Sequence, residues 1–181
     1  MITLDQAQTV YDFEGIFEPI VAAVFTSGGV ACATPGTITK FQTVRPRIEL
    51  MMRCGGAVPR GTSGQRVIVD TLGNIRDAAY RGELNVTVIT NAMESDKVVH
   101  TQLRAYVRAL MMELPIAINN TTIAIPNASP VIGLTNHRLN FIQHTGDTWT
   151  IKNADGYWQT GMTFSIEFAI QSNALQTLGA T

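Results

Sequence analysis

Regular alternation of apolar and polar residues marks the strands that the sequence predicts most clearly. Near the C-terminus, large apolar side chains occupy every second position: Met162, Phe164, Ile166, Phe168 and Ile170. Side chains with a period of two point to the same face of a strand, so one face of this segment is predicted to be buried. Weaker alternation predicts further strands from Arg47 to about 53 and over 81–90, 135–143 and 148–152.

Two other segments repeat their apolar residues at helical spacing. One stripe predicts a helix that begins after Ser95 or Asp96 and ends at Pro115: Val99, Leu103, Tyr106, Val107, Leu110, Met111 and Leu114. Apolar positions up to Phe25 predict an N-terminal helix region over 1–26, in which Gly15 and Pro19 predict a kink or a break. The stretch from there to about residue 40 is predicted to be a loop of small residues.

Glycine, proline and serine residues interrupt the pattern after the first strand. They predict an exposed loop or hairpin arm over 54–77, with a short strand at 66–69. The order helix, strand, strand, helix, strand, strand predicts an α+β fold. We therefore expect residues 1–181 to form a single domain, with a mostly antiparallel sheet of about four strands, two main helices packed on one face, and the extended arm.

The composition adds a surface that is polar but weakly charged. Charged residues make up 15% of the chain, against about 25% in typical soluble domains, whereas Thr, Asn and Gln together number 41. Hydroxyls and amides cost less to desolvate than ions, so this surface hints at contact with other subunits, although the bias of the source composition is an equally good explanation. No apolar run approaches the length of a membrane span and no secretory signal begins the chain, so we expect a soluble protein made in a cytoplasm and without membrane contact.

Candidate catalytic and metal-binding patterns are weak throughout. His100 lacks a second His or Cys at helical spacing, and His137 and His144 are expected to face solvent or to lie in loops. The two cysteines, Cys32 and Cys54, are 22 positions apart. The glycine-rich stretch at 55–64 lacks the Lys-Ser/Thr ending and the following helix of a phosphate-binding loop. No pair of carboxylates suggests a general acid and base. We therefore predict that the chain is not an enzyme and binds no metal or cofactor.

Charge is segregated along the chain. Residues 1–39 carry −4, residues 40–81 carry +5 and the remainder carries −2. Opposite charges on two segments of one chain suit head-to-tail packing of identical subunits. The arginines of the basic segment are the candidate contacts with a neighbouring subunit or with DNA phosphates: Arg45, Arg47, Arg53, Arg60 and Arg66.

Several phrases of the sequence occur together in one known family. They are Phe41-Gln42-Thr43 followed by Arg45-Pro46-Arg47-Ile48-Glu49-Leu50, the strand from Arg81 to Thr90, and His100 followed by the segment from Leu103 to Leu110. Their order resembles that of tailed-bacteriophage tail-completion and head-to-tail joining proteins of the tail-terminator type. The resemblance covers about 41–52, 80–114 and 155–172.

The resemblance implies a structural virion protein, assembled in the host cytoplasm. Such a chain would form a homo-oligomeric ring, expected to be a hexamer, that closes the tail tube and joins it to the head. Its partners would be itself, tail-tube proteins and head-connector proteins, with non-specific contact to packaged DNA. The alternatives are another tail component (a tube, adaptor or decoration protein) and a small α+β ligand-binding domain or enzyme.

Overall fold

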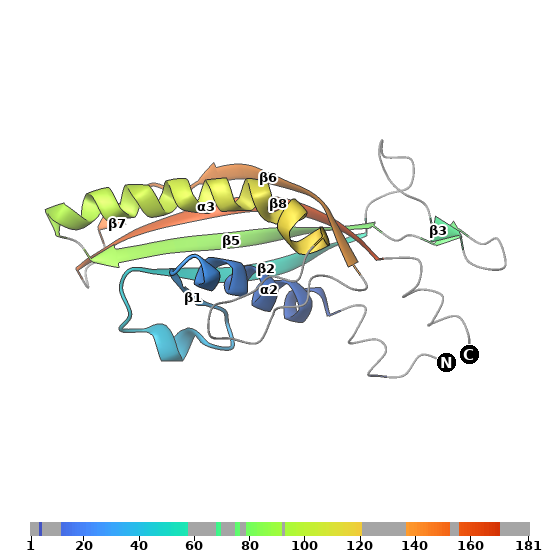
Figure 1. The fold of residues 1–181 in the computed structure, drawn as a ribbon, viewed down its shortest axis with the longest axis horizontal. Helices are drawn as coiled ribbons and strands as arrows, with labels where there is room; N and C mark the ends of the chain where they lie inside the picture. The colour runs from blue at the N-terminus through green and yellow to red at the C-terminus, as the bar shows by residue number, and fades with distance from the viewer. Residues whose placement is uncertain are drawn as a thin grey trace.

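In a computed structural model, two helices pack on one long twisted sheet (Figure 1). The structure describes residue 4 and residues 12–57, 68–69, 75–76, 79–91, 93–120, 137–152 and 156–170. The helices are α2 (Phe13–Ser27), a 3-10 helix (Ile38–Phe41) and α3 (Glu94–Asn120). The strands are β1 (Ala31–Ala33), β2 (Arg47–Ala57), β3 (Ile68–Val69), β4 (Ile75–Arg76), β5 (Ala79–Asn91), β6 (His137–Asp147), β7 (Ile151–Lys152) and β8 (Tyr157–Ile170).

The main sheet confirms the α+β class, but it has six strands where about four were predicted, and it is mixed. Its strand order is β1-β2-β5-β8-β6, with β7 also paired to β8, and β1 runs parallel to β2 while the other pairs are antiparallel. The predicted loop before residue 40 contains β1, so that prediction is wrong at 31–33. A strand of three small residues, Ala-Cys-Ala, has too little alternation to be recognised from its sequence.

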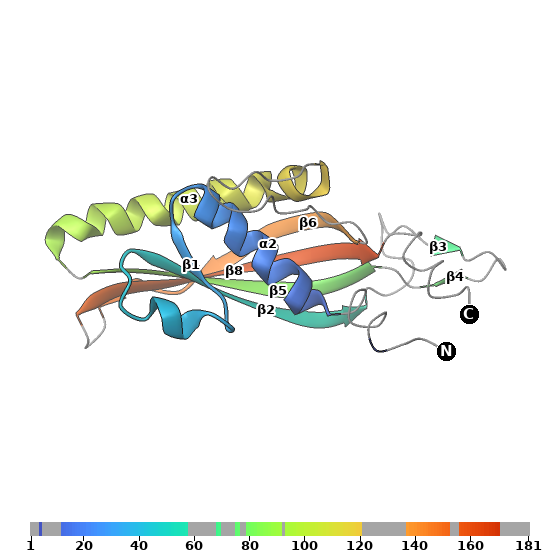
Figure 2. The ribbon, with the colours of Figure 1, turned by 60° about the horizontal axis from the view of Figure 1, so that its bottom comes forward.

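The core lies between one face of the sheet and the two helices. In register, Leu84 pairs with Phe164 and Val86 pairs with Met162, and all four side chains are buried. The pattern predicted for the last strand is thus confirmed at 162, 164 and 166, whereas the side chains of 168 and 170 lie outside the described ones. Helix α2 packs on β1 and β2, while α3 packs on β5 and β6 (Figure 2).

Both long helices contain a proline, and neither stops there. Pro19 lies inside α2, which continues from Phe13 to Ser27, and Asp12 caps its start by accepting the Gly15 N–H over 3.0 Å. Pro115 lies inside α3, so the predicted helix end at that residue is wrong by five residues. The buried stripe that ends in Leu114 continues to hold the helix on the sheet. Of the predicted N-terminal helix region, residues 1–3 and 5–11 lie outside the described part.

Carboxylates on α2 occupy the free edge of β2. Strand β1 pairs only with residues 47–49 of β2. Further along, Glu18 Oε1 accepts the Met52 N–H over 2.7 Å and Glu14 Oε1 accepts the Cys54 N–H over 2.9 Å. Unpaired edge N–H groups invite another strand, so these contacts block sheet extension at this edge. Burial raises the pKa of Glu18 against the opposing effect of the Met52 hydrogen bond.

The predicted arm is described only in part. Strand β2 extends to Ala57 and pairs with β5, so the arm predicted to begin at residue 54 is wrong over 54–57. The short strands β3 and β4 form an antiparallel pair in which Ile68 faces Arg76. The short strand predicted at 66–69 therefore coincides with β3. The other residues of 58–78 lie outside the described part.

Candidate interaction surface

The sheet face opposite α2 and α3, here called the open face, carries mainly small uncharged polar side chains. Thr163 Oγ1 donates to Asn85 Oδ1 over 3.0 Å, and Asn85 Nδ2 donates to Glu83 Oε1 over 2.9 Å. Met51, on the neighbouring strand, is 60% exposed. A face of hydroxyls and amides with an exposed methionine can be desolvated by another protein without burying unpaired ions.

Charge on the described open face is balanced residue for residue. Arg47 contacts Glu49, with Nη2–Oε1 at 2.6 Å, and Arg81 contacts Glu167, with Nε–Oε2 at 3.4 Å. Arg53 faces Glu83 in the β2–β5 register. Three arginines therefore stand beside three glutamates: Arg47, Arg53 and Arg81 with Glu49, Glu83 and Glu167. The sum is zero, so this face does not supply the net positive charge that non-specific DNA binding needs.

The structure places Arg47 inside the protein, which corrects the prediction that it faces a neighbour or DNA. Its residue is 6% exposed, and Nε donates to Glu49 Oε1 over 2.8 Å. Nη1 also donates to the carbonyl oxygens of Gln42 and Val44, at 2.9 and 3.3 Å. Nη1 of Arg45 donates to the same two carbonyls, each over 2.7 Å. The two arginines together thus hold the chain that leads into β2.

The remaining predicted arginines are dispersed. The guanidinium of half-buried Arg45 lies 4.9 Å from the ring centroid of Tyr157, a cation–π contact between the segment before β2 and the start of β8. Arg53 is exposed on the open face. Arg60 and Arg66 lie outside the described residues. The five predicted contact residues therefore do not form one patch in the part of the chain that is described.

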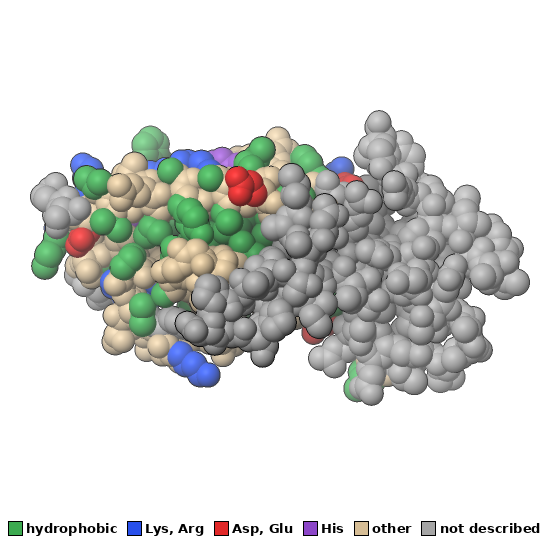
Figure 3. Space-filling view, viewed as in Figure 1, with side chains coloured by type: hydrophobic (Ala, Val, Ile, Leu, Met, Phe, Trp, Pro, Cys, Tyr) green, Lys and Arg blue, Asp and Glu red, His purple; other side chains and the backbone are tan. Residues whose placement is uncertain are grey.

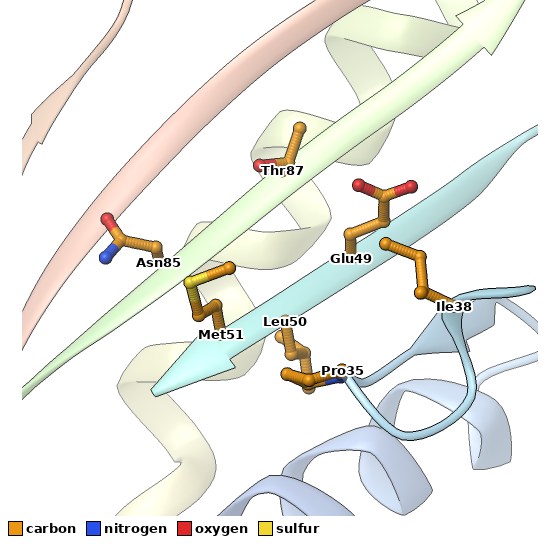
Figure 4. A pocket seen from close by; sticks show the side chains of 7 residues that line it. All are labelled: Pro35, Ile38, Glu49, Leu50, Met51, Asn85 and Thr87. Carbon is orange, nitrogen blue, oxygen red and sulfur yellow. The ribbon is translucent and has the colours of Figure 1, made fainter. Parts of the chain in front are cut away.

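An apolar groove of about 360 Å³ lies where the segment after β1 meets the open face (Figure 4). It is lined by Pro35, Ile38, Glu49, Leu50, Met51, Asn85 and Thr87. Glu49 is the one titratable side chain in this lining, and Arg47 already pairs with it. The groove can hold an apolar group but does not offer an acid and a base.

A buried hydrogen-bonded chain connects α3 to the sheet through His100. His100 is 3% exposed; its Nδ1 lies 3.0 Å from Thr90 Oγ1 and its Nε2 lies 2.8 Å from Thr160 Oγ1. Thr160 Oγ1 in turn lies 2.7 Å from Thr150 Oγ1. Burial, followed by the positive charge of Arg104, lowers the pKa of His100. A neutral ring with two hydroxyl partners holds β5 and β8 against α3, which is a structural role.

Asp147 gathers positive side chains at the end of β6. Its Oδ2 accepts from Arg104 Nη2 over 2.7 Å and from Arg108, and its Oδ1 lies 2.5 Å from His144 Nε2. Burial on its own would raise the pKa of Asp147, but hydrogen bonds from Arg104 and His144 and the charge of Arg108 lower it. Asp147 is therefore a carboxylate that fastens α3 to β6.

Trp149 lies on the surface between two threonines, each of which is hydrogen-bonded to β8. The Thr148 N–H donates to the Gly161 carbonyl and the Gly161 N–H donates to Thr148 Oγ1, both over 2.8 Å. On the other side, Thr150 binds Thr160 and also accepts from Arg104 Nη1 over 3.3 Å. The Trp149 residue itself is 91% exposed.

Sequence reasoning did not identify His100, Asp147 or Trp149 as members of a site. The partners of His100 lie 10 and 60 residues away, and Arg104 lies 43 residues from Asp147. The spacing of Arg104 and Arg108, one helical turn apart, was the one local signal that they share a face. An exposed tryptophan is not distinguishable from a buried one in a sequence without a clear period.

Metal and membrane features are absent from the part of the chain that is described. No three His, Cys, Asp or Glu side chains among those residues gather as metal ligands would. None of the described helices combines the length and apolar character of a membrane span. Burial raises the pKa of the Cys32 thiol to about 12, which makes it a poor nucleophile.

Comparison with known proteins identifies no family. No family model matches the chain, and no curated protein matches it. One solved structure is similar over 94% of this chain and 97% of its own, with 13% identity and a TM-score of 0.41, and its name describes no function. A likeness of this size carries no argument about function.

Proposed function

We propose that this chain is a structural virion protein of a tailed bacteriophage, a tail-terminator or neck subunit whose copies form a ring that closes the tail tube and joins it to the head. The open face is the observation that carries the proposal within the structure. It is polar and charge-balanced, and α2 and α3 both pack on the opposite face of the sheet. The assignment to a phage tail is supported by the sequence resemblance of residues 41–52 and 80–114 to tail-terminator proteins.

The character of the surface favours protein partners. Figure 3, which views the molecule as Figure 1 does with α3 toward the reader, shows few charged side chains among hydrophobic and uncharged polar ones on the described part of that side. Zero net charge on the open face likewise favours contact with protein over contact with packaged DNA. In this proposal any DNA contact falls to Arg60 and Arg66, because Arg47 is buried and Arg53 faces Glu83.

The blocked edge of β2 bears on how copies associate. Glu14 and Glu18 occupy backbone donors that an added strand would need. Copies of the chain therefore cannot pair strands at this edge, and a contact made there uses side chains. Such a contact favours a closed assembly with a defined rotation between copies over indefinite growth of the sheet.

Two alternatives make different use of the same features. A tube subunit needs complementary upper and lower faces and polymerises without limit. A ligand-binding domain would use the groove of about 360 Å³ beside Met51, which is at the small end of the range for such sites.

The oligomeric state of the purified chain tests the proposal. We expect native mass spectrometry and analytical ultracentrifugation to show a single closed oligomer, independent of concentration above its assembly threshold. Filaments of increasing mass would move the assignment to a tube protein. A monomer or dimer over the whole concentration range would contradict the ring.

A further inference from the structure

Trp149 has the features of a binding anchor. Its indole is exposed although the backbone on both sides is fixed, by the paired hydrogen bonds of Thr148 to Gly161 and by the contact of Thr150 with Thr160. An exposed side chain on a mobile loop would lose backbone entropy as well as side-chain entropy on binding, whereas the backbone beside Trp149 is already held. Ile151, two residues on, is 53% exposed and extends the apolar surface. Tryptophan is the residue type most enriched among those that dominate interface energies.

The surroundings of Trp149 are positively charged. Arg104 and Arg108 share the single carboxylate of Asp147, and Lys152 is exposed three residues after Trp149. Arg104, Arg108 and Lys152 against Asp147 give a sum of +2. An anchor with this rim favours an acidic partner surface.

The opposite side of the same molecule is acidic. Residues 12–39 contain Asp12, Glu14 and Glu18 and no lysine or arginine; Asp12 and Glu14 are half-buried and reach the surface, whereas Glu18 is buried. These side chains lie at the start of α2, beside the β2 edge of the sheet, while Trp149 lies beside β8 at the β6 edge.

The two regions are related by an offset along the strands. Gly161, which binds Thr148, pairs with Thr87, and Thr87 pairs with Glu49. Cys54, which binds Glu14, follows Glu49 by five residues, or about 17 Å at strand spacing. Identical copies placed edge to edge with this shift bring the positive edge of one against the acidic edge of the next.

We propose that Trp149 is the central anchor of a head-to-tail contact between copies of this chain, packing against the α2 edge of the neighbouring copy, with Lys152, Arg104 and Arg108 facing its Asp12 and Glu14. The contact is heterologous, so each copy uses both of its edges. The assembly closes into a ring when the rotation angle between neighbouring copies is a whole fraction of 360°. This inference rests on the proposed ring and assigns its subunit interface.

Removing the indole is the direct test. Trp149→Ala changes an exposed side chain, so circular dichroism and the unfolding midpoint should match those of the unchanged chain. We expect the dissociation constant between copies to rise about 30-fold or more, as for other anchor residues. Val98→Ala is the matched control, because Val98 is 61% exposed on α3 but lies at a helical position away from Arg104 and Arg108. Lys152→Glu should weaken association and reduce its sensitivity to salt.

Mixing two variants tests the head-to-tail geometry. Trp149→Ala keeps the acidic edge, and the pair Asp12→Asn with Glu14→Gln keeps the indole and the acceptors for the Gly15 and Cys54 N–H groups, so each variant should associate only weakly on its own. Their mixture contains one intact contact and should form a one-to-one pair that does not grow. Two folded variants that show no pair on mixing would overturn the assignment.

Fluorescence gives a readout that does not depend on disrupting the assembly. The chain has two tryptophans, so Trp158→Phe leaves Trp149 as the sole emitter. Its emission should shift to shorter wavelength as the oligomer forms. An oligomer that forms without this shift, or that tolerates Trp149→Ala, contradicts the interface but leaves the ring intact. A chain that stays monomeric contradicts both.

Discussion

Replacing His100 by leucine would test whether the buried hydrogen-bonded chain holds α3 on the sheet. The replacement keeps a side chain of similar size, but it leaves the Thr90 hydroxyl, which is 1% exposed, without its described partner. Thr160 retains its contact with Thr150. A buried hydroxyl without a partner costs about 1–3 kcal/mol, so we expect the free energy of unfolding to fall by about 2 kcal/mol at pH 7.5.

The same substitution has a predictable pH dependence. Burial, then the charge of Arg104, lowers the pKa of His100 below the ordinary value of 6.5, so the fold favours the neutral ring. As the pH falls below about 6.5 the unfolded chain binds a proton that the folded chain does not, and wild-type stability declines by at most about 1.4 kcal/mol per pH unit. His100→Leu lacks this decline, so the stability gap between the two chains should narrow from pH 7.5 to pH 5.5.

Urea unfolding at the two pH values measures both effects. Adding Thr90→Val to His100→Leu removes both hydrogen-bonding partners and should recover at least half of the loss, because no buried polar group is then left unpaired. A leucine variant as stable as wild type at pH 7.5, or a gap that does not change with pH, would refute this reasoning.

Three further substitutions test other parts of the structure. Glu18→Gln keeps an acceptor for the Met52 N–H and removes a carboxylate whose pKa burial raises, so at pH 7 its free energy of unfolding should equal or exceed that of wild type. As the pH falls through the folded pKa of Glu18, the stability of wild type should rise relative to that of Glu18→Gln. Glu18→Ala removes the acceptor and should cost about 1–3 kcal/mol in urea unfolding. Phe164→Ala should cost about 3–5 kcal/mol in the same assay, because Phe164 is 2% exposed at the centre of the core. The pKa of Asp147 is lowered in the fold, so wild type should lose stability as the pH falls from about 3.8 through that lowered pKa and the carboxylate is protonated. Asp147→Asn has no carboxylate at this position, so acid unfolding of this variant should lack that loss.

The sequence was most informative where one local pattern determined the structure. Strict alternation located β8, and the apolar stripe located α3, because both patterns depend on burial of a single face. Strand β1 was missed because its pairing with β2 is a long-range contact between small residues. The end of α3 was misplaced because packing of the helix on β5 and β6 outweighs the local effect of Pro115.

The site was less predictable than the fold because its contacts join distant segments. Arg47 was assigned to the surface as one of several arginines. In the structure its guanidinium donates hydrogen bonds within the chain, to Glu49 and to the carbonyl oxygens of 42 and 44. The acidic start of α2 was correctly identified as a feature, but its contacts with β2 backbone donors require knowledge of which strand lies beneath the helix. A surface for other subunits depends on which side chains remain exposed, and sequence spacing determines this only for regular elements.

Negative-stain imaging of the purified chain mixed with tail tubes from the same particle tests the central claim most directly. The proposal predicts a closed ring of the free chain and additional density that caps one end of the tubes. Tubes with bare ends beside an unassembled chain, or open filaments of the chain itself, would contradict the proposed role as a terminator.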